Sequence, residues 1–502
     1  MNDSKTTQRA FAPTGLSGLN EVLNGGFPRD RVLLVEGEPG SGKTTLALQF
    51  LLAGVAAGET CLLITLSESK AELAHVAESH GWDLSGIHML ELVASESELE
   101  PMSTYTVFEP AEVELGETIA SIVAEVERLK PRRIVIDSLS EFRLLAQSSI
   151  RYRHQTLALK QFFSGRDCTV LLLDDRTSSQ GDLDLHSITH GVISLEQLAP
   201  EFGGSRRRLR IVKMRGQHYA GGWHDFALHR GGMVVFPRLV ANDRDSRPAG
   251  TPLRSGIQGL DDLLGGGIDR GTATMLTGPT GTGKSTVAAT YASAAAAAGN
   301  RVAMFLFDER PATLLARLDG MNVPLREQIG AGLVTVQQID PAQLSPSEFA
   351  NLVQSVVEPK DGKPATVVVI DSLNGYLLGM PDERFLNLHL HELLTYLSQL
   401  GVATFITVVQ RGLDGVSGDS ILEASYLADT VVAFRYFEFE GEIHQAVSVV
   451  KRRTGRHERT LREMKFSTDG VHVGEPLTRY RGLITGVPTQ VPQASLQSEQ
   501  DA

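Results

Sequence analysis

The chain has few of the features that mark secreted, membrane-spanning or thiolate-metal proteins. Its 502 residues include only two cysteines, Cys61 and Cys168. Each lies in an apolar run typical of a strand, so we expect buried free thiols and no disulfide framework or thiolate metal site. No apolar run reaches the length of a membrane span, and Met1–Thr14 lacks the apolar core of a signal peptide. We therefore expect a cytoplasmic protein with no membrane partner.

A basic surplus is also missing, because the formal net charge is −13. Nucleic-acid-binding domains usually present a basic face, so this balance makes a nucleic-acid partner unlikely. Charge alone does not exclude one, because local basic clusters occur at Arg206–Arg208 and Lys451–Arg453. With 42% hydrophobic and 21% charged residues, the composition is that of a globular protein whose length predicts two or three domains.

The sequence repeats itself once over most of its length. Gly256, Gly278 and Lys284 each stand 241 positions after Gly15, Gly37 and Lys43. Solenoid repeats are several times shorter, so this period indicates a duplicated domain. We expect an N-terminal arm over residues 1–13, a first domain over 14–240, a linker over 241–251, a second domain over 252–486 and a disordered tail over 487–502.

Each half alternates short β-branched runs with helical patterns. The near-continuous apolar character of these runs is typical of a mostly parallel sheet covered by helices on both faces. The fold class is therefore α/β, in two tandem domains, each a mostly parallel sheet flanked by helices. The predicted strands are Val32–Val35, Cys61–Leu66, Ile134–Ile136, Val170–Leu173 and Leu209–Val212, then Thr274–Leu276, Val302–Phe307, Thr366–Ile370, Thr404–Val409 and Ala446–Val450.

A Walker A pattern occurs in each half, between a predicted strand and a predicted helix. Glycines let backbone N–H groups converge on phosphates, the lysine reaches the β- and γ-phosphates, and the following hydroxyl ligates Mg²⁺. Two matches in register with the duplication make chance unlikely as their origin, and they predict ATP and Mg²⁺ as ligands. The expected ATP-contacting residues are Gly37, Gly40, Ser41, Gly42, Lys43, Thr44 and Thr45, and Gly278, Gly281, Thr282, Gly283, Lys284, Ser285 and Thr286.

An aspartate follows a later apolar strand in each half, at Asp137 and Asp371. A carboxylate there can hold the hydration shell of Mg²⁺ from the side opposite the phosphate loop. Together with Thr44 and Ser285, these aspartates are the expected metal ligands.

Hydrolysis also needs a group that orients or deprotonates water. In RecA-like proteins this is a glutamate after the strand that follows the P-loop helix, where the chain has Ser67-Glu68 and Asp308-Glu309. At this point the chain resembles the KaiC family, tandem RecA-like ATPases and autokinases of circadian clocks, which carry paired acidic residues here. The resemblance implies catalytic roles for Glu68, Asp308 and Glu309. Ser67 departs from the pair and puts first-half hydrolysis in question.

The resemblance extends to a late strand that ends in Lys-x-Arg in both halves. In the family such cations act on the γ-phosphate held by the neighbouring subunit, which implies this role for Lys213, Arg215, Lys451 and Arg453. It also implies nucleotide contact by His457, assembly into a homohexameric ring, and KaiB-like clock or signalling proteins as candidate partners. The short tail does not clearly preserve the segment gripped by the family's KaiA-like activator.

The family phosphorylates adjacent hydroxyl residues in its second domain. Here the corresponding dipeptide is Ser425-Tyr426, so Ser425 is a candidate phosphoacceptor, and an interface serine is the equally weighted alternative. Two other functions stay open: a RecA- or DnaB-like DNA-dependent ATPase, and a scaffold in which ATP only joins subunits.

Overall fold

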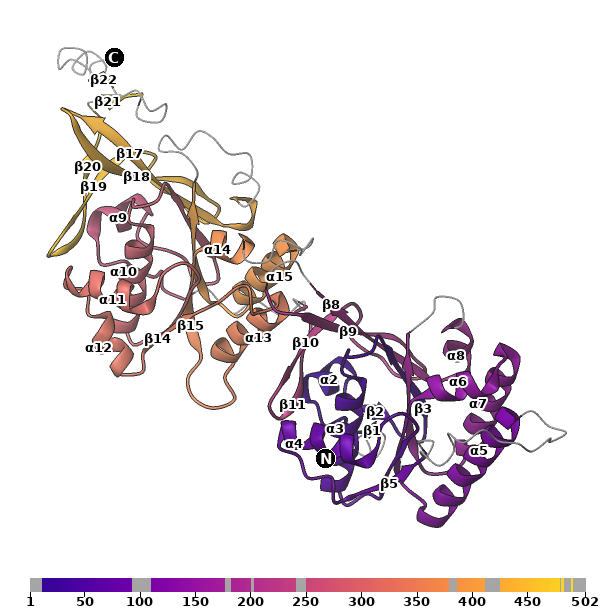
Figure 1. Ribbon diagram of the computed structural model, residues 1–502. Coiled ribbons are helices and arrows are strands. Elements are labelled where there is room, and N and C mark those ends of the chain that lie inside the picture. Colours follow the sequence, from indigo (N-terminus) through magenta and orange to yellow (C-terminus); the bar gives the residue numbers. More distant parts are fainter. Residues whose placement is uncertain are drawn as a thin grey trace. The chain divides into compact units, whose positions relative to one another are not determined.

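In the computed structural model, the chain divides into two compact units, Met1–Arg238 and Leu239–Ala502 (Figure 1). The structure describes residues 11–92, 110–176, 182–199, 203–240, 250–378, 386–410, 425–478, 480–482 and 489–490. The predicted arm lies outside the described residues except for its last three, as do most of the predicted linker and tail. No helix in these ranges is long and apolar enough to cross a bilayer.

The first unit contains a nine-stranded sheet in the order β11-β10-β9-β8-β3-β7-β6-β4-β5. The strands from β8 to β5 run parallel, and β9, β10 and β11 continue the sheet in antiparallel fashion. The bounds are β3 Val32–Gly37, β4 Cys61–Thr65, β5 Ile87–Glu91, β6 Arg133–Asp137, β7 Thr169–Asp175, β8 Gly191–Leu198, β9 Arg206–Met214, β10 His224–His229 and β11 Gly232–Phe236, and a separate pair is formed by β1 Phe11–Ala12 and β2 Phe27–Pro28.

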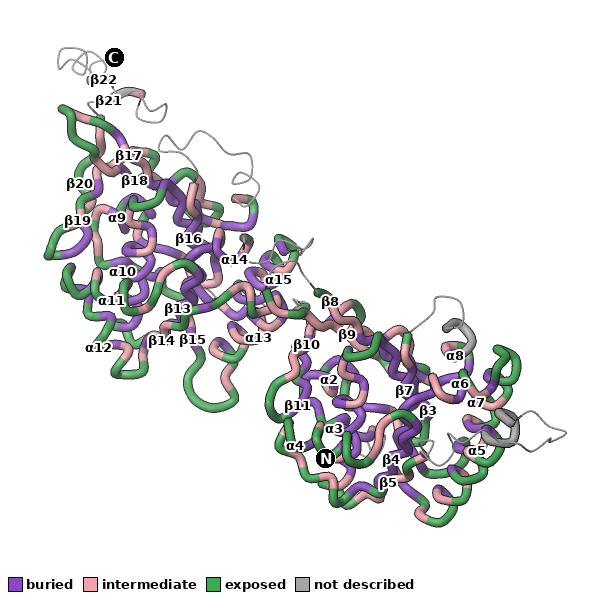
Figure 2. Tube along the Cα trace, in the orientation of Figure 1, coloured by how far each residue is buried: buried purple, intermediate pink, exposed green. Residues whose placement is uncertain are grey.

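Helices cover both faces of this sheet. Two apolar clusters form the core, one packed under α2, α3 and α4, the other under α5, α6 and α7. Figure 2 shows the central strands as the most buried part of the unit. The helices are α2 Ser17–Val22, α3 Lys43–Ala56, α4 Lys70–His80, α5 Pro110–Leu129, α6 Leu139–Ala146, α7 Ser149–Phe163 and α8 Asp182–Ile188.

The second unit repeats this architecture strand for strand. Its sheet has the order β14-β13-β15-β16-β12-β17-β18-β19-β20, parallel from β14 to β17 and antiparallel beyond. The strands are β12 Ala273–Gly278, β13 Arg301–Leu306, β14 Val334–Gln338, β15 Ala365–Asp371, β16 Ala403–Val409, β17 Thr430–Phe439, β18 Glu442–Arg452, β19 Arg462–Ser467 and β20 Gly470–Pro476, followed by the pair β21 Tyr480–Arg481 and β22 Thr489–Gln490.

The helices of the second unit also pack on both faces of their sheet, over two apolar clusters. They are α9 Gln258–Leu263, α10 Lys284–Ala297, α11 Pro311–Asp319, α12 Leu325–Gly330, α13 Pro346–Val357, α14 Leu373–Leu378 and α15 Leu386–Gln399, with a 3-10 turn at Ser425–Leu427.

The α/β fold class is confirmed, and every predicted strand is present, with ends shifted by at most two residues except at the starts of β9 and β18, which lie three and four residues before the predicted ones. For example, β13 ends at Leu306 and not at Phe307. Sequence analysis missed most of the antiparallel extension, because strands such as β10 and β19 mix buried with half-exposed positions and carry no continuous apolar run. Both cysteines are buried free thiols, as expected.

Candidate functional site

Both glycine-rich loops turn from a buried strand directly into a helix. Gly42 and Gly283 cap α3 and α10 with φ angles of 98° and 90°, a left-handed conformation that favours glycine. At Gly283 a Cβ atom would lie 1.9 Å from Phe466 Cζ, so no side chain fits there. The unpaired N–H groups that begin each helix form an anion-binding site of the kind that holds phosphates.

The groups predicted to hold Mg²⁺ meet beside these loops. Thr44 Oγ1 donates a hydrogen bond of 2.8 Å to Asp137 Oδ2, and Ser285 hydrogen-bonds Asp371 in the second unit. Ser41 Oγ is buried and has no hydrogen-bond partner among the described residues. In each loop a hydroxyl next to a carboxylate fits a magnesium–nucleotide ligand. The first loop adds the unsatisfied hydroxyl of Ser41, whereas the equivalent Thr282 of the second loop donates to Pro279 O.

The two aspartates have raised pKa values, chiefly because they are buried. For Asp137, the hydrogen bond from Thr44 and the charge of Lys43 offset only part of this effect. For Asp371, bonds from Thr407 and Ser285 do the same. Because burial disfavours a bare carboxylate, each site gains from a bound cation.

The two phosphate-loop lysines are both buried but have different partners. Lys43 Nζ donates to the carbonyl oxygens of Gly37 at 3.0 Å and Glu38 at 2.9 Å, and lies 2.7 Å from Asp175 Oδ1. Lys284 Nζ donates to Gly278 O at 2.9 Å and Pro279 O at 2.7 Å. Burial lowers the pKa of Lys284 to about 8, which the charge of Asp371 only partly opposes.

The candidate catalytic glutamates occupy equivalent positions, each just before the N-cap of the following helix. In the first unit, a capping box between Ser69 and Glu72 fixes the start of α4. Glu68 Oε2 is buried without a hydrogen-bond partner in the described part of the chain. Burial raises the pKa of Glu68, and the charge of Asp137 adds to this effect. The carboxylate therefore combines an oxygen that is not hydrogen-bonded within the described part of the chain with a raised basicity, which suits proton transfer.

In the second unit the glutamate is held by a cation. Arg317 NH1 and NH2 bind Glu309 Oε1 and Oε2 at 2.6 and 2.8 Å in a bidentate pair. Asp308 is turned elsewhere and accepts a hydrogen bond from Ser372, next to Asp371. The two members of this acidic pair therefore have different surroundings, and Asp308 is the one bonded beside the candidate metal ligand.

The Lys-x-Arg cations bind the same segment in both units. Lys213 donates to His186 O, and Arg215 donates to Ser187 O at 3.2 Å. Lys451 Nζ donates to Ser425 O and Ala428 O at 2.9 and 2.7 Å. Burial lowers the pKa of both lysines, and the neighbouring arginine adds to this effect. These cations thus stand at the strand end, on the segment that precedes β8 or β17.

The candidate phosphoacceptor lies under these second-unit cations. Arg453 NH2 donates to Tyr426 O at 3.0 Å, and Arg453 NH1 lies 3.3 Å from Asp429 Oδ1. Ser425 is half-buried and begins the 3-10 turn, while the side chain of Tyr426 is exposed. His457 lies in the loop between β18 and β19. Ser425 is therefore next to positive charge that could attract a phosphoryl group.

Sequence analysis missed two charged residues of these pockets, Asp175 and Arg317. The first follows from strand register, since Gly37 pairs with Asp175 across β3 and β7, just before the phosphate loop. The second lies eight residues after Glu309, on the helix that follows it. The contact of Asp175 follows only from the order of the strands in the sheet. The contact of Arg317 follows only from the direction of α11.

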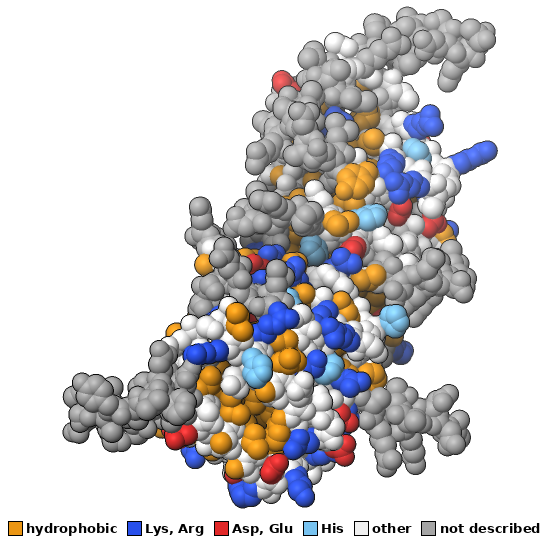
Figure 3. Space-filling model, turned by 90° about the vertical axis from the view of Figure 1, so that its right-hand side faces the viewer, with side chains coloured by type: hydrophobic (Ala, Val, Ile, Leu, Met, Phe, Trp, Pro, Cys, Tyr) orange, Lys and Arg blue, Asp and Glu red, His pale blue; other side chains and the backbone are white. Residues whose placement is uncertain are grey.

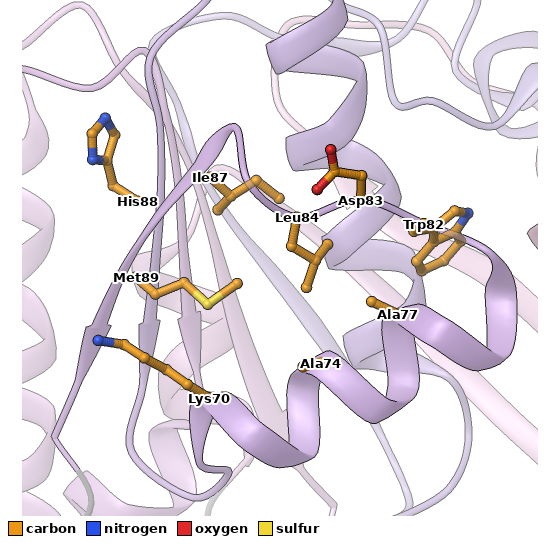
Figure 4. A pocket seen from close by; sticks show the side chains of 9 residues that line it. All are labelled: Lys70, Ala74, Ala77, Trp82, Asp83, Leu84, Ile87, His88 and Met89. Atoms are coloured by element: carbon orange, nitrogen blue, oxygen red, sulfur yellow. The ribbon is translucent and has the colours of Figure 1, made fainter.

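A hollow between α4 and β5 lies outside the predicted sites. Figure 4 shows that apolar side chains such as Leu84, Ile87 and Met89 line it, with Lys70, Asp83 and His88 among them. None of the predicted site residues lines it, so we do not assign the nucleotide to this hollow.

Both units of the chain are similar to known proteins. A family model described as "ATPase: KaiC" matches residues 12–240 and 253–478. The circadian clock protein KaiC3 of Synechocystis sp. is 26% identical, over 99% of this chain and 98% of that protein. The circadian clock oscillator protein KaiC of Synechococcus elongatus is 25% identical, over 98% of this chain and 94% of its own. Both similarities extend across both units.

Proposed function

The chain belongs to the KaiC family of ATPases, and from that premise we propose that it binds Mg²⁺·ATP in both phosphate loops and hydrolyses it at the subunit interfaces of a homohexameric ring. The observation that carries the proposal is the twinned pocket, in which a buried lysine and a hydroxyl–aspartate pair recur in the same arrangement. Bound Mg²⁺ would supply a positive charge against the phosphates.

The residues of the pockets divide the work of hydrolysis. Lys43 and Lys284 hold the β- and γ-phosphates, while Thr44 with Asp137 and Ser285 with Asp371 hold the metal. Glu68 and the Asp308–Glu309 pair orient and deprotonate water. Lys213, Arg215, Lys451 and Arg453 of one subunit stabilise the charge that develops in the pocket of its neighbour, and His457 contacts the nucleotide there.

An exposed apolar surface on the first unit supports assembly. Leu144, Ile150 and Leu157 of α6 and α7 are 71%, 80% and 37% exposed. Figure 3 views this unit from the side on which α5 and α7 lie in Figure 1, and shows hydrophobic side chains among lysines and arginines. Apolar side chains gathered in this way are typical of protein–protein contact.

Particle mass and phosphate release together test this function. We expect mass photometry to detect hexamers that require Mg²⁺·ATP, and steady-state phosphate release that falls in a Glu68→Gln/Glu309→Gln variant. A chain that stays monomeric with saturating nucleotide, or that binds no ATP, would overturn the proposal. Assembly with ATP but without phosphate release would indicate the scaffold alternative. Salt-sensitive DNA binding that stimulates phosphate release would indicate a DNA-dependent ATPase.

We further propose that the second unit phosphorylates Ser425 and that the protein serves in signalling or timing, with KaiB-like proteins as candidate partners. The contacts of Lys451 and Arg453 with the Ser425–Asp429 segment support this assignment. After incubation with Mg²⁺·ATP, we expect mass spectrometry to find phosphate on Ser425, and none in Ser425→Ala. Phosphate that is absent from Ser425 in the wild-type protein would leave this serine as an interface residue.

A further inference from the structure

Asp175 is the last residue of β7, the strand that lies beside β3 and the start of the first phosphate loop. Its register partner is Gly37, the first residue of the loop. Its Oδ1 atom lies 2.7 Å from Lys43 Nζ, and its Oδ2 atom accepts a hydrogen bond of 3.1 Å from Ser140 Oγ. The carboxylate is therefore fixed between the lysine and α6, and its side chain is 28% exposed.

The second unit has no charge at the equivalent place. There Gly278 pairs with Val409 across β12 and β16. Asn374, the counterpart of Ser140, binds the backbone of Val409, accepting from its N–H at 2.6 Å and donating to its carbonyl at 3.2 Å. The same strand end is therefore anionic in the first pocket and apolar in the second.

The ion pair with Asp175 uses the N–H donor of Lys43 that the two loop carbonyls leave for a phosphate. A lysine ammonium has three N–H donors, and Lys43 has three acceptors: two loop carbonyls and Asp175. A phosphate that binds Lys43 must displace this carboxylate or share the ammonium with it. The carboxylate charge also acts on the rest of the pocket, because it contributes to the raised pKa values of Glu68 and Asp137.

We propose that Asp175 is a specificity-determining residue of the first pocket, a built-in counter-ion of Lys43 that weakens binding of ATP more than binding of ADP. The inference rests on the proposed function, since it concerns nucleotide in the same phosphate loop. ATP has one phosphate more than ADP and therefore more negative charge facing the carboxylate, and like charges at close range repel most strongly inside a partly buried site.

The test uses the full chain with the second pocket silenced by Lys284→Ala. Calorimetry measures the Kd for AMP-PNP, a non-hydrolysable ATP analogue, and for ADP, both with Mg²⁺. In Asp175→Asn we expect AMP-PNP to bind about tenfold more tightly, equivalent to about 1.4 kcal/mol, and ADP to gain less than about threefold. Asp175→Val, which copies the second pocket, should give the same ranking. Ser140→Ala is the matched control, because it removes a contact of Asp175 but no charge.

The reciprocal change tests the same position in the other pocket. In a Lys43→Ala background, Val409→Asp should weaken AMP-PNP binding about tenfold, whereas Val409→Asn should have a smaller effect because it adds no charge. The inference is overturned if removing the charge at Asp175 leaves AMP-PNP affinity unchanged or lower, or if ADP gains as much as AMP-PNP.

Failure of the inference is distinct from failure of the proposed function. If AMP-PNP binds neither pocket of the wild-type chain, the nucleotide assignment itself is wrong. If AMP-PNP binds normally but the Asp175 variants show no preferential gain, only the role of this carboxylate is wrong.

Discussion

The two units share a strand order and a phosphate loop but differ in the charges around them. In the first unit, Asp175 forms an ion pair with Lys43, and Glu68 has a buried oxygen with no hydrogen bond in the described part of the chain. In the second unit, Lys284 bonds only carbonyl oxygens among the described residues, and Arg317 forms an ion pair with Glu309. The differences fall at equivalent positions: Asp175 and Val409, Val76 and Arg317, Ser67 and Asp308, Arg133 and Val367.

The conformation of the phosphate loops and the charges around them depend on different residues. The loop conformation depends on glycines with positive φ and on the strand–helix junction, and both units keep these features. The charge pattern depends on single side chains at strand ends and on one helix face, which can change without altering the fold. One backbone arrangement thus supports two pockets that we expect to differ in affinity and rate.

The largest effect should come from the loop lysines. Lys43→Ala or Lys284→Ala should each weaken ATP binding about hundredfold in its own pocket, because a buried charge-assisted contact is lost. Calorimetry should then count one bound nucleotide per chain where the wild type binds two. The control variant Lys70→Ala, in the hollow of Figure 4, should still bind two nucleotides per chain. Loss of both nucleotides in either single lysine variant would contradict the independence of the pockets.

The candidate bases come next. Glu68→Gln and Glu309→Gln should each slow phosphate release from its own pocket about hundredfold, within the usual contribution of general base catalysis. Each is measured with the other pocket silenced by its lysine variant, and nucleotide affinity serves as the control because it should change little. If Glu309→Gln has no effect and Asp308→Asn does, the aspartate bonded to Ser372 is the base of the second pocket.

The core of the first unit contains a buried arginine, Arg133, where the core of the second has Val367. Arg133 is fully buried, binds Glu59 Oε2 at 2.5 Å, and donates to Pro13 O and Phe50 O, each at 2.7 Å. The bonds from Arg133 and Arg29 lower the pKa of Glu59 against the opposing effect of burial.

Arg133→Met should destabilise the first unit by about 3 kcal/mol, because Pro13 O and Phe50 O lose their donor and Glu59 keeps only Arg29 as a partner. Urea denaturation measures the change. Adding Glu59→Gln should restore part of the loss, whereas equal destabilisation in the double variant would show that the ion pair does not matter.

The first unit should also be more sensitive to acid, through His224. The Arg238 N–H donates to His224 Nδ1 at 2.8 Å, and Nε2 lies 3.0 Å from Ala220 O. Burial lowers the pKa of His224, with Arg238 adding to the effect and Asp225 opposing it. The unfolded chain therefore binds a proton near pH 6.5 that the folded chain does not, so stability falls as pH drops below that value.

Hydrogen exchange of β10 and β11 at pH 5 and 7.5 checks this expectation. The change should not exceed about 1.4 kcal/mol per pH unit, and His224→Gln should flatten it. Equal acid sensitivity in wild type and variant would assign the effect to other groups.

The smallest effect should come from the clamp on Glu309. The pair is partly exposed, with side chains 37% and 22% accessible, so its loss should change stability by less than about 1 kcal/mol. Arg317→Val, which copies Val76, should raise phosphate release from the second pocket about threefold by freeing the glutamate. Val76→Arg should lower the rate in the first. A decrease in Arg317→Val would instead make the arginine a positioning residue needed for catalysis.

Much of the fold and of the candidate site could be predicted from residue patterns. Glycine spacing predicted both phosphate loops, apolar runs predicted four of the parallel strands in each unit but not β5, β8, β14 and β17, and the 241-residue shift predicted two like units. The antiparallel strands were mostly missed, since half-exposed edge strands lack a strong period. The roles of the predicted site residues stay predictions, although the structure brings Thr44 to Asp137 and Ser285 to Asp371.

The sequence alone determined the class of chemistry, because a phosphate loop is local: its glycines, lysine and hydroxyl are neighbours in the chain. It did not determine which charges surround that chemistry. Asp175 reaches Lys43 across 132 positions only because β7 lies beside β3. Arg317 reaches Glu309 only because α11 begins just after Glu309 and carries Arg317 on the side of the helix that faces this glutamate. Strand order and helix direction are properties of the whole fold, so the difference between the two pockets became visible only in three dimensions.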